Sequence, residues 1–179
     1  ESEKIKLLRS LRLLDKIPEK QLASLERFLK PLSLKDGAIV FEEGSKGHSL
    51  YFISSGHITI SKLVSGTAYK DLAILGPGDC FGEMALIEEI SRSARASASG
   101  KAVVFELGRK DLNEWLKSRP ELAMGFFAEL VQVQSQRLRR TSSELALLFD
   151  LSNLLLETHS SGQDLLNRVK QLKELKLHL

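Results

Sequence analysis

The residues best suited to chemistry lie in the middle of the chain, where Glu83 and Arg92 stand nine residues apart. Just before them, Gly82 lets the backbone approach a ligand closely and turn sharply. If a short helical turn runs from Glu83 to Ile87, its first backbone N–H groups form a concave anion site. The guanidinium of Arg92 is a permanent forked cation that suits a phosphate group, and the Ser93 hydroxyl adds a donor. Since the Glu83 carboxylate can accept hydrogen bonds from a sugar hydroxyl, the pattern predicts a pocket for a sugar phosphate.

The elements that must position these residues are short strands between about residues 32 and 107. Apolar or alternating runs recur there, at 38–41, 50–54, 57–63, 72–75, 94–98 and 102–107. Glycines separate the runs, at Gly37, Gly44, Gly47, Gly56, Gly66, Gly76, Gly78 and Gly100. Short strands with a glycine turn after each indicate a compact β-roll or barrel, so we expect turns at these glycines.

Helical periodicity flanks this core on both sides. Leucines recur at helical spacing through residues 1–30, with a break at Ile17-Pro18. A short helix is predicted over 110–117, and Pro120 suits the first turn of the next helix. No later proline interrupts that helix, which can therefore extend for up to about 40 residues, or roughly 60 Å. The predicted fold class is α+β, an antiparallel, jelly-roll-like β-roll flanked by N-terminal helices and a long C-terminal helix.

The long helix carries a seam of residues at heptad spacing. Val131, Leu138, Leu145 and Ser152 share one heptad position, and Gln134, Thr141, Leu148 and Leu155 share its partner position. A seam that mixes apolar and polar side chains predicts a parallel two-stranded contact, and hence a homodimer. The alternative is that the helix packs on its own β-roll. The pattern breaks at 160–162, and a further amphipathic helix is predicted over 164–177.

Composition and charge restrict the class of protein. The chain has 179 residues, 42% of them apolar, which suffices for one domain with a buried core. A net charge of +3 is too small for a dedicated polybasic nucleic-acid binder. With a single cysteine and no apolar run near the ~20 residues of a membrane span, we expect a cytoplasmic protein without a membrane partner. The start at Glu-Ser-Glu, with no Met or leader, is typical of a fragment of a longer protein.

The sequence shows no sign of catalysis or of a metal site. The four histidines lack the spacing of metal ligands, and no nucleophile–base arrangement is recognisable. The glycine-rich segments lack the lysine of a P-loop. We therefore expect no metal, no cofactor and no enzymatic activity.

The segment 81–86, followed by 92–94, resembles the phosphate-binding cassette of cyclic nucleotide-binding domains. Bacterial catabolite activators, protein kinase A regulatory subunits and nucleotide-gated channels share this domain. The gap from the cassette glycine to its arginine has the usual length of the family, and 44–56 resembles the strand–turn–strand pattern upstream of the cassette. The resemblance covers about residues 10–145 and implies the family's β-roll fold.

The resemblance also implies a set of ligand-binding residues, which is Gly82, Glu83, Met84, Ala85, Arg92, Ser93, Thr141 and Ser142. Gly82 and Ala85 would contact the phosphate through backbone N–H groups, together with Ser93. Arg92 would pair with the exocyclic phosphate oxygens, and Glu83 would bind the ribose 2′-hydroxyl.

The remaining roles concern the purine and the long helix. By resemblance, Ile60, Leu72 and Ala73 would line the purine with apolar contacts. Thr141 would contact the purine of its own subunit, and Ser142 would reach the pocket of the partner subunit. Arg137, one helical turn before Thr141, would pair with Glu83 and couple the pocket to the helix.

We therefore expect an intracellular cyclic nucleotide sensor with cyclic AMP as its favoured ligand and cyclic GMP as the other candidate. Thr141 and Ser142 favour cyclic AMP, and Ser93 stands where a threonine implies cyclic GMP in some branches of the family. Residues 1–145 would form the cyclic nucleotide-binding domain, and 146–179 a helical extension or the start of a following domain. The output domain would lie outside this fragment.

Three other readings of the sequence stay open. The first is the ligand-binding half of a catabolite-activator-like transcription factor without its DNA-binding domain. Only 34 residues follow Leu145, without a recognition-helix pattern, so we expect no direct nucleic-acid binding. The second is the input module of a multidomain signalling protein or regulated enzyme, because 149–166 resembles the opening helix of a GAF-type sensor domain. The third, a domain of this fold that senses another small molecule, is disfavoured by Glu83 and Arg92.

Overall fold

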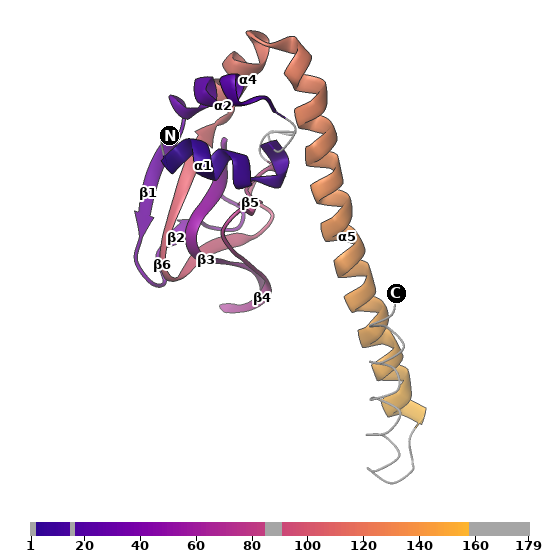
Figure 1. The fold of residues 1–179 in the computed structure, drawn as a ribbon. Coiled ribbons are helices and arrows are strands. Elements are labelled where there is room, and N and C mark those ends of the chain that lie inside the picture. The colour runs from indigo at the N-terminus through magenta and orange to yellow at the C-terminus, as the bar shows by residue number, and fades with distance from the viewer. Residues whose placement is uncertain (1–2, 15–16, 85–90, 158–179) are drawn as a thin grey trace. The chain divides into compact units, whose positions relative to one another are not determined.

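The computed structural model describes residues 3–14, 17–84 and 91–157. The chain divides into two compact units, Glu1–Val131 and Gln132–Leu179. The first unit holds the N-terminal helices, all the strands in the described residues and the start of the last helix (Figure 1). The predicted boundary of the sensor domain at residue 145 stays a prediction.

Helices at the N-terminus precede the sheet. They are α1 (Glu3–Ser10), the 3-10 turn η1 (Arg12–Leu14) and α2 (Glu19–Glu26). Helix α2 begins directly after Pro18, whose fixed φ is compatible with a helix start. This confirms the predicted break at Ile17-Pro18. The expectation of helix up to residue 30 is wrong at its end, because the first strand already begins at Lys30.

Six strands form one antiparallel sheet that curls into a roll. They are β1 (Lys30–Leu34), β2 (Ile39–Phe41), β3 (Ser49–Ser65), β4 (Ala68–Leu75), β5 (Cys80–Phe81) and β6 (Arg95–Gly108). The main path is β1-β6-β3-β4, while β2 pairs with β6 and β5 pairs with β3. The predicted fold class, with helices on either side of an antiparallel β-roll in sequence, is confirmed.

Two glycines that were expected to end strands lie inside them instead. Gly56 is within β3 and Gly100 within β6, and both have positive φ, of 76° and 77°. The β3–β6 register shifts between Ile53 and Ser55 and again between Ser55 and His57, across Gly56. A Cβ at Gly56 would lie 2.2 Å from the Lys101 carbonyl oxygen, so only glycine allows the two backbones to approach this closely. The glycines bend two long strands rather than separating four short ones.

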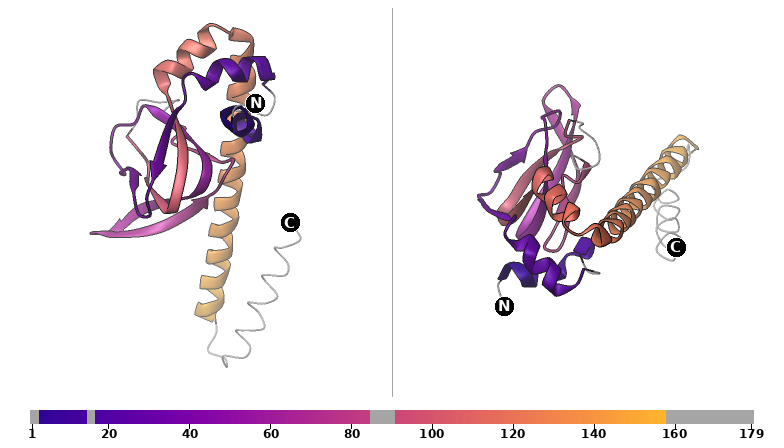
Figure 2. Two further views of the ribbon diagram at one scale, coloured as in Figure 1. Left: turned by 60° about the vertical axis from the view of Figure 1, so that its left-hand side comes forward. Right: turned by 90° about the horizontal axis from the view of Figure 1, so that it is seen from above.

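Two hydrophobic clusters stabilise the first unit. One lies inside the roll and includes Ile53, Ile58, Phe81 and Val104. The other joins the leucines of the N-terminal helices to α4 (Arg109–Lys117), where Trp115 is fully buried and donates a hydrogen bond to the Ser24 hydroxyl. Two views show α2 and α4 at one end of the roll and the β3–β4 hairpin at the other (Figure 1; Figure 2).

The last described helix, α5 (Pro120–Glu157), has 38 residues and confirms the predicted long helix. Its first turns belong to the core, since Leu122, Phe126 and Leu130 are buried. Further along, the apolar members of the predicted seam are exposed, at 62% for Val131, 68% for Leu138, 62% for Leu145 and 55% for Leu148. None of the helices in the described part of the chain combines the length and the apolar character that a membrane span needs. The helix predicted over 164–177 lies outside the described residues.

Candidate functional site

Arg92 lies inside the β-roll, where two backbone carbonyls hold its guanidinium. Only 6% of the residue is exposed. Its Nη1 donates a hydrogen bond to the Gly82 carbonyl at 2.9 Å, and its Nη2 donates one to the Ser49 carbonyl at 3.0 Å. Gly82 has a φ of 79°, and a Cβ there would lie 2.7 Å from Nη1. The cassette glycine is therefore required by its backbone conformation and by the close approach of the arginine.

Aromatic rings and a second glycine fix the position of this guanidinium. The Cζ atom of Arg92 lies 4.1 Å from the centroid of the Phe41 ring and 5.7 Å from that of Tyr51. Phe81 in turn stacks on Tyr51, with 5.1 Å between the ring centroids. A Cβ at Gly47 would lie 2.1 Å from Arg92 Nε, so no larger residue fits there without moving the arginine. Ring faces attract a cation, which stabilises Arg92 in this position.

The surroundings of Arg92 make it a desolvated cation beside acidic groups. Burial lowers the pKa of Arg92, whereas Tyr51, Glu83 and Glu106 act in the opposite direction. Glu106 accepts a hydrogen bond from the Ser49 hydroxyl at 2.6 Å and one from the Tyr51 hydroxyl at 3.4 Å. Glu83 is itself only 6% exposed. Within the described residues, no group accepts a hydrogen bond from Arg92 Nε, so this buried donor has no partner there.

The loop after β2 holds the backbone on either side of Arg92. The Gly44 N–H donates to the Arg92 carbonyl at 2.8 Å, and the Arg92 N–H donates to the Ser45 carbonyl at 2.8 Å. Lys46 and Ser91 form an isolated antiparallel bridge next to these bonds. The main chain of the arginine is therefore fixed by a short ladder, although Arg92 precedes the strand β6.

The other predicted cassette residues are placed in different ways. Ser93 is exposed, and its carbonyl accepts a hydrogen bond from Lys62 Nζ at 3.1 Å. Met84 is 46% exposed. Ala85 and the helical turn predicted up to Ile87 lie outside the described residues. The structure thus brings Gly82 and Arg92 into contact. Glu83 and Ser93 are the residues that directly follow them in the sequence.

The predicted purine contacts lie along the β3–β4 pair. Ile60 is directly opposite Ala73 in the ladder. Ile60 also packs against the cluster inside the roll, whereas Leu72 is 52% exposed and Ala73 is exposed. Leu72 falls where the register shifts, so its side chain follows no regular pairing. The structure groups Ile60 with Ala73, and the purine role of all three stays a prediction.

The residues predicted on the long helix belong to the second unit. Thr141 and Ser142 are exposed on α5, and Arg137 is half-buried. The Thr141 hydroxyl donates to the Arg137 carbonyl one turn earlier, at 3.1 Å. Such a bond is common for threonine in helices and leaves the hydroxyl oxygen able to accept. Contact of these residues with a purine, and of Arg137 with Glu83, stays a prediction.

Several residues around Arg92 were missed by sequence reasoning. They are Phe41, Gly47, Ser49, Tyr51, Lys62 and Glu106. Lys62 contacts the adjacent Ser93, and the others contact Arg92 or residues that contact it. They come from strands and loops distant in sequence. Only the Gly44–Gly47 loop carried a signal, because two glycines three residues apart suggest a tight turn. In residues 3–14, 17–84 and 91–157, no three His, Cys, Asp or Glu side chains are grouped to hold a metal ion.

Comparison with known proteins gives a family match that overlaps this site. Residues 31–119 match the model of the cyclic nucleotide-binding domain. This range contains the β-roll, the cassette and Arg92 with all its contacts.

Two similar proteins are a bacterial transcriptional regulator and a bacterial cyclic AMP receptor protein. A CRP-like cAMP-activated global transcriptional regulator of Mycobacterium tuberculosis is 33% identical over 125 residues, which are 70% of this chain and 54% of the regulator. The cyclic AMP receptor protein of Thermus thermophilus is 34% identical over 131 residues, which are 73% of this chain and 58% of the receptor. The chain thus spans little more than half the length of these relatives.

A solved structure shares the fold over most of the chain. It is the N-terminal domain of a transcriptional regulator from Streptomyces coelicolor A3(2), with a TM-score of 0.65 and 28% identity. The match covers 78% of this chain and 94% of that domain.

Proposed function

Residues 31–119 belong to the cyclic nucleotide-binding domain family, and from this premise we propose that the chain is a cyclic AMP sensor that regulates an output domain. One observation carries the proposal. Arg92, on the cassette, is a buried cation with a hydrogen-bond donor that no described group uses. A cation that has lost most of its water gains more from an anionic ligand than an exposed one would.

The cassette would bind the cyclic phosphate, which has one negative charge and two free oxygens. Arg92 would donate to these oxygens, with the Gly82 N–H and the Ser93 hydroxyl as further donors. Glu83 would accept the ribose 2′-hydroxyl. Because Arg92 is already fixed by carbonyls and rings, little side-chain order has to be gained on binding.

Cyclic AMP is preferred over cyclic GMP on two grounds. Ser93 follows the arginine, in the position where threonine marks cyclic GMP binders in some branches of the family. Two of the similar regulators are also named for cyclic AMP. The direct purine contacts would come from Thr141 and Ser142.

Ligand binding would reach the output through α5. This helix runs without interruption from the buried Phe126 to the segment that carries Thr141 and Ser142. A ligand with different contacts in two states of the helix would shift the population between them. The exposed heptad seam, with Leu138 and Leu145, would join two chains in a homodimer.

A second candidate is the ligand-binding half of a transcription factor. It is supported by the similar transcriptional regulator of Mycobacterium tuberculosis, of which this chain spans 54%. A natural protein with a helix-turn-helix domain after residue 179 that binds DNA only with cyclic AMP would establish it. The cytoplasmic location and the lack of direct nucleic-acid binding by this chain stay predictions of the sequence.

The direct test is calorimetric titration of the 179-residue chain with cyclic AMP and cyclic GMP. The protein is first unfolded and refolded to remove copurified nucleotide. We expect micromolar or tighter binding of cyclic AMP and weaker binding of cyclic GMP. If neither nucleotide binds to a correctly refolded chain, the proposed function is wrong.

A further inference from the structure

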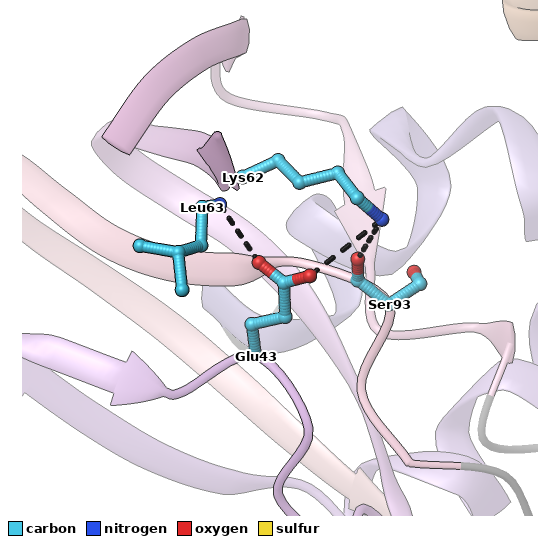
Figure 3. A network of polar contacts seen from close by, with 4 residues as sticks. All are labelled: Glu43, Lys62, Leu63 and Ser93. Carbon is cyan, nitrogen blue, oxygen red and sulfur yellow. Dashed lines mark hydrogen bonds and ion pairs between the residues drawn. The ribbon is translucent and has the colours of Figure 1, made fainter. Parts of the chain in front are cut away.

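A polar network ties the β3–β4 hairpin to the segment that carries Arg92 and Ser93 (Figure 3). Lys62 Nζ lies 3.6 Å from Glu43 Oε1 and donates a hydrogen bond to the Ser93 carbonyl at 3.1 Å. Glu43 Oε2 accepts a hydrogen bond from the Leu63 N–H at 2.9 Å. Both carboxylate oxygens of Glu43 and the ammonium group of Lys62 therefore have partners within this one network.

The network joins three segments that are far apart in sequence. Glu43 belongs to the loop after β2, Lys62 to the distal half of β3, and Ser93 to the approach to β6. The same loop holds the Arg92 backbone, through the bonds of Gly44 N–H to the Arg92 carbonyl and of Arg92 N–H to the Ser45 carbonyl. The Lys62 hydrogen bond thus fixes the Ser93 carbonyl, which is next in sequence after the Arg92 carbonyl that the loop already holds.

A neighbouring cation repeats the arrangement. Arg95 Nε lies 3.4 Å from Glu42 Oε2, and the Arg95 Cζ atom lies 4.8 Å from the centroid of the Tyr69 ring on β4. Adjacent glutamates of one loop therefore each hold a cation from a different strand. Glu43 binds the β3 side of the hairpin, and Glu42 binds a residue that reaches its β4 side.

The exposure of the Lys62–Glu43 ion pair favours a role in positioning the backbone over a role in stabilising the fold. The Lys62 side chain is 50% exposed and that of Glu43 is 25% exposed. Ion pairs with this exposure contribute little to the free energy of unfolding. Bonds directed at backbone groups nevertheless restrict the path of the main chain. A phosphate site whose donors are held in place beforehand binds more tightly than one that must be ordered.

We propose that Glu43 and Lys62 are positioning residues of the nucleotide site, which hold the Arg92–Ser93 backbone and link ligand occupancy to the β3–β4 hairpin. This rests on the proposed function, because the benefit of the network is measured as nucleotide affinity. Neither Glu43 nor Lys62 is proposed to contact the ligand. Each acts through the backbone that carries Ser93 and Arg92.

The test compares Lys62→Met, Lys62→Arg and Glu43→Gln with a matched control, Lys70→Met. Lys70 is an exposed lysine on β4, directly opposite Lys62 in the ladder. We expect Lys62→Met and Glu43→Gln to weaken cyclic AMP binding about fivefold to tenfold, as loss of a charge-assisted hydrogen bond would. Lys62→Arg should recover most of the affinity, and the melting temperature should change little in all four variants. Equal affinity of Lys62→Met, Lys70→Met and the unchanged chain would overturn the proposal.

A ligand-free measurement separates this proposal from the proposed function. In amide NMR spectra, Lys62→Met should shift the Arg92 and Gly44 resonances, and Glu43→Gln should speed hydrogen exchange at Leu63. Lys70→Met should do neither. Unchanged Arg92 and Gly44 resonances in Lys62→Met would overturn the proposal even if the unchanged chain binds cyclic AMP. Failure of the unchanged chain to bind any cyclic nucleotide would instead contradict the function, and the spectra would still decide the positioning role.

Discussion

Arg92 is a charged residue in a place that usually holds apolar ones. Two carbonyls accept its hydrogen bonds, the Phe41 ring lies against it, and Tyr51, Glu83 and Glu106 act against the lowering of its pKa by burial. Buried charges are costly to desolvate, and the Nε donor of this cation has no acceptor among the described residues. Both points support the proposal that Arg92 binds an anionic ligand.

Gly47 provides the space that this arginine occupies. In Gly47→Ala, the new Cβ would lie 2.1 Å from Arg92 Nε, so the guanidinium must move. We expect cyclic AMP affinity to fall by about tenfold or more, as for a displaced charge-assisted contact. Calorimetry measures this directly. Gly125→Ala is the control, since a Cβ there meets nothing within 4 Å, and wild-type affinity in Gly47→Ala would contradict the account.

Tyr51 should give the fold a measurable dependence on alkaline pH. Burial raises its pKa above the ordinary value of 10.0, and Glu106 adds to the rise. A raised pKa means that the folded state holds the phenolic proton more tightly than the unfolded state. The stability from this group is therefore complete below pH 10 and is lost as the pH rises through the folded-state pKa.

Urea denaturation from pH 8 to pH 11 checks this prediction. The unchanged chain should lose more stability over this range than Tyr51→Phe, which has no proton to lose. Parallel curves for the two proteins would show that Tyr51 titrates as it does in the unfolded chain.

Among the elements, the strands show how far local pattern determines the fold. The predicted runs located β2, β3, β6 and the second half of β4, but no run covered β1 or the two-residue β5. The long helix was predicted to within a few residues. Gly56 and Gly100 were assigned to turns because glycine is common in the turns that connect strands. Their actual place, inside β3 and β6, depends on the close approach of two backbones, which no local pattern encodes.

The two strand glycines should respond differently to the same substitution. Both have positive φ, but a Cβ at Gly56 meets the Lys101 carbonyl at 2.2 Å, whereas a Cβ at Gly100 meets nothing within 4 Å. Gly100→Ala should cost only the strain of the left-handed conformation, about 1–2 kcal/mol. Gly56→Ala should cost more, by about 1–3 kcal/mol, because the strands must separate. Chemical denaturation gives both values, and equal losses would refute the close approach as the reason for Gly56.

The candidate site was predictable only where its residues are close in sequence. Gly82, Glu83 and Arg92 follow from one segment, since phosphate chemistry restricts residue type and spacing there. The carbonyl of Ser49, the Phe41 ring and the Glu106 carboxylate come from three separate strands. Their approach to Arg92 follows from strand pairing, which composition and periodicity do not specify.

At the scale of the whole molecule, the seam of α5 exposes large apolar side chains that a second chain could cover. Leu138 and Leu145 are 68% and 62% exposed at the same heptad position. If two chains pair there, Leu138→Glu combined with Leu145→Glu should convert a dimer to a monomer, because like charges would face each other across the seam. Sedimentation equilibrium measures the mass. The control is Ala146→Glu, an exposed position outside the seam, and a monomeric unchanged chain would refute the dimer.

The proposed binding of cyclic AMP depends most of all on Arg92. The most direct test is calorimetric titration of Arg92→Gln with cyclic AMP beside the unchanged chain, after circular dichroism has shown that both are folded. Glutamine keeps hydrogen-bonding groups but removes the charge. We predict that the affinity for cyclic AMP falls by about 100-fold or more, as expected for loss of a buried ionic pair with phosphate. A folded Arg92→Gln chain that binds cyclic AMP within about threefold of the unchanged chain would contradict it.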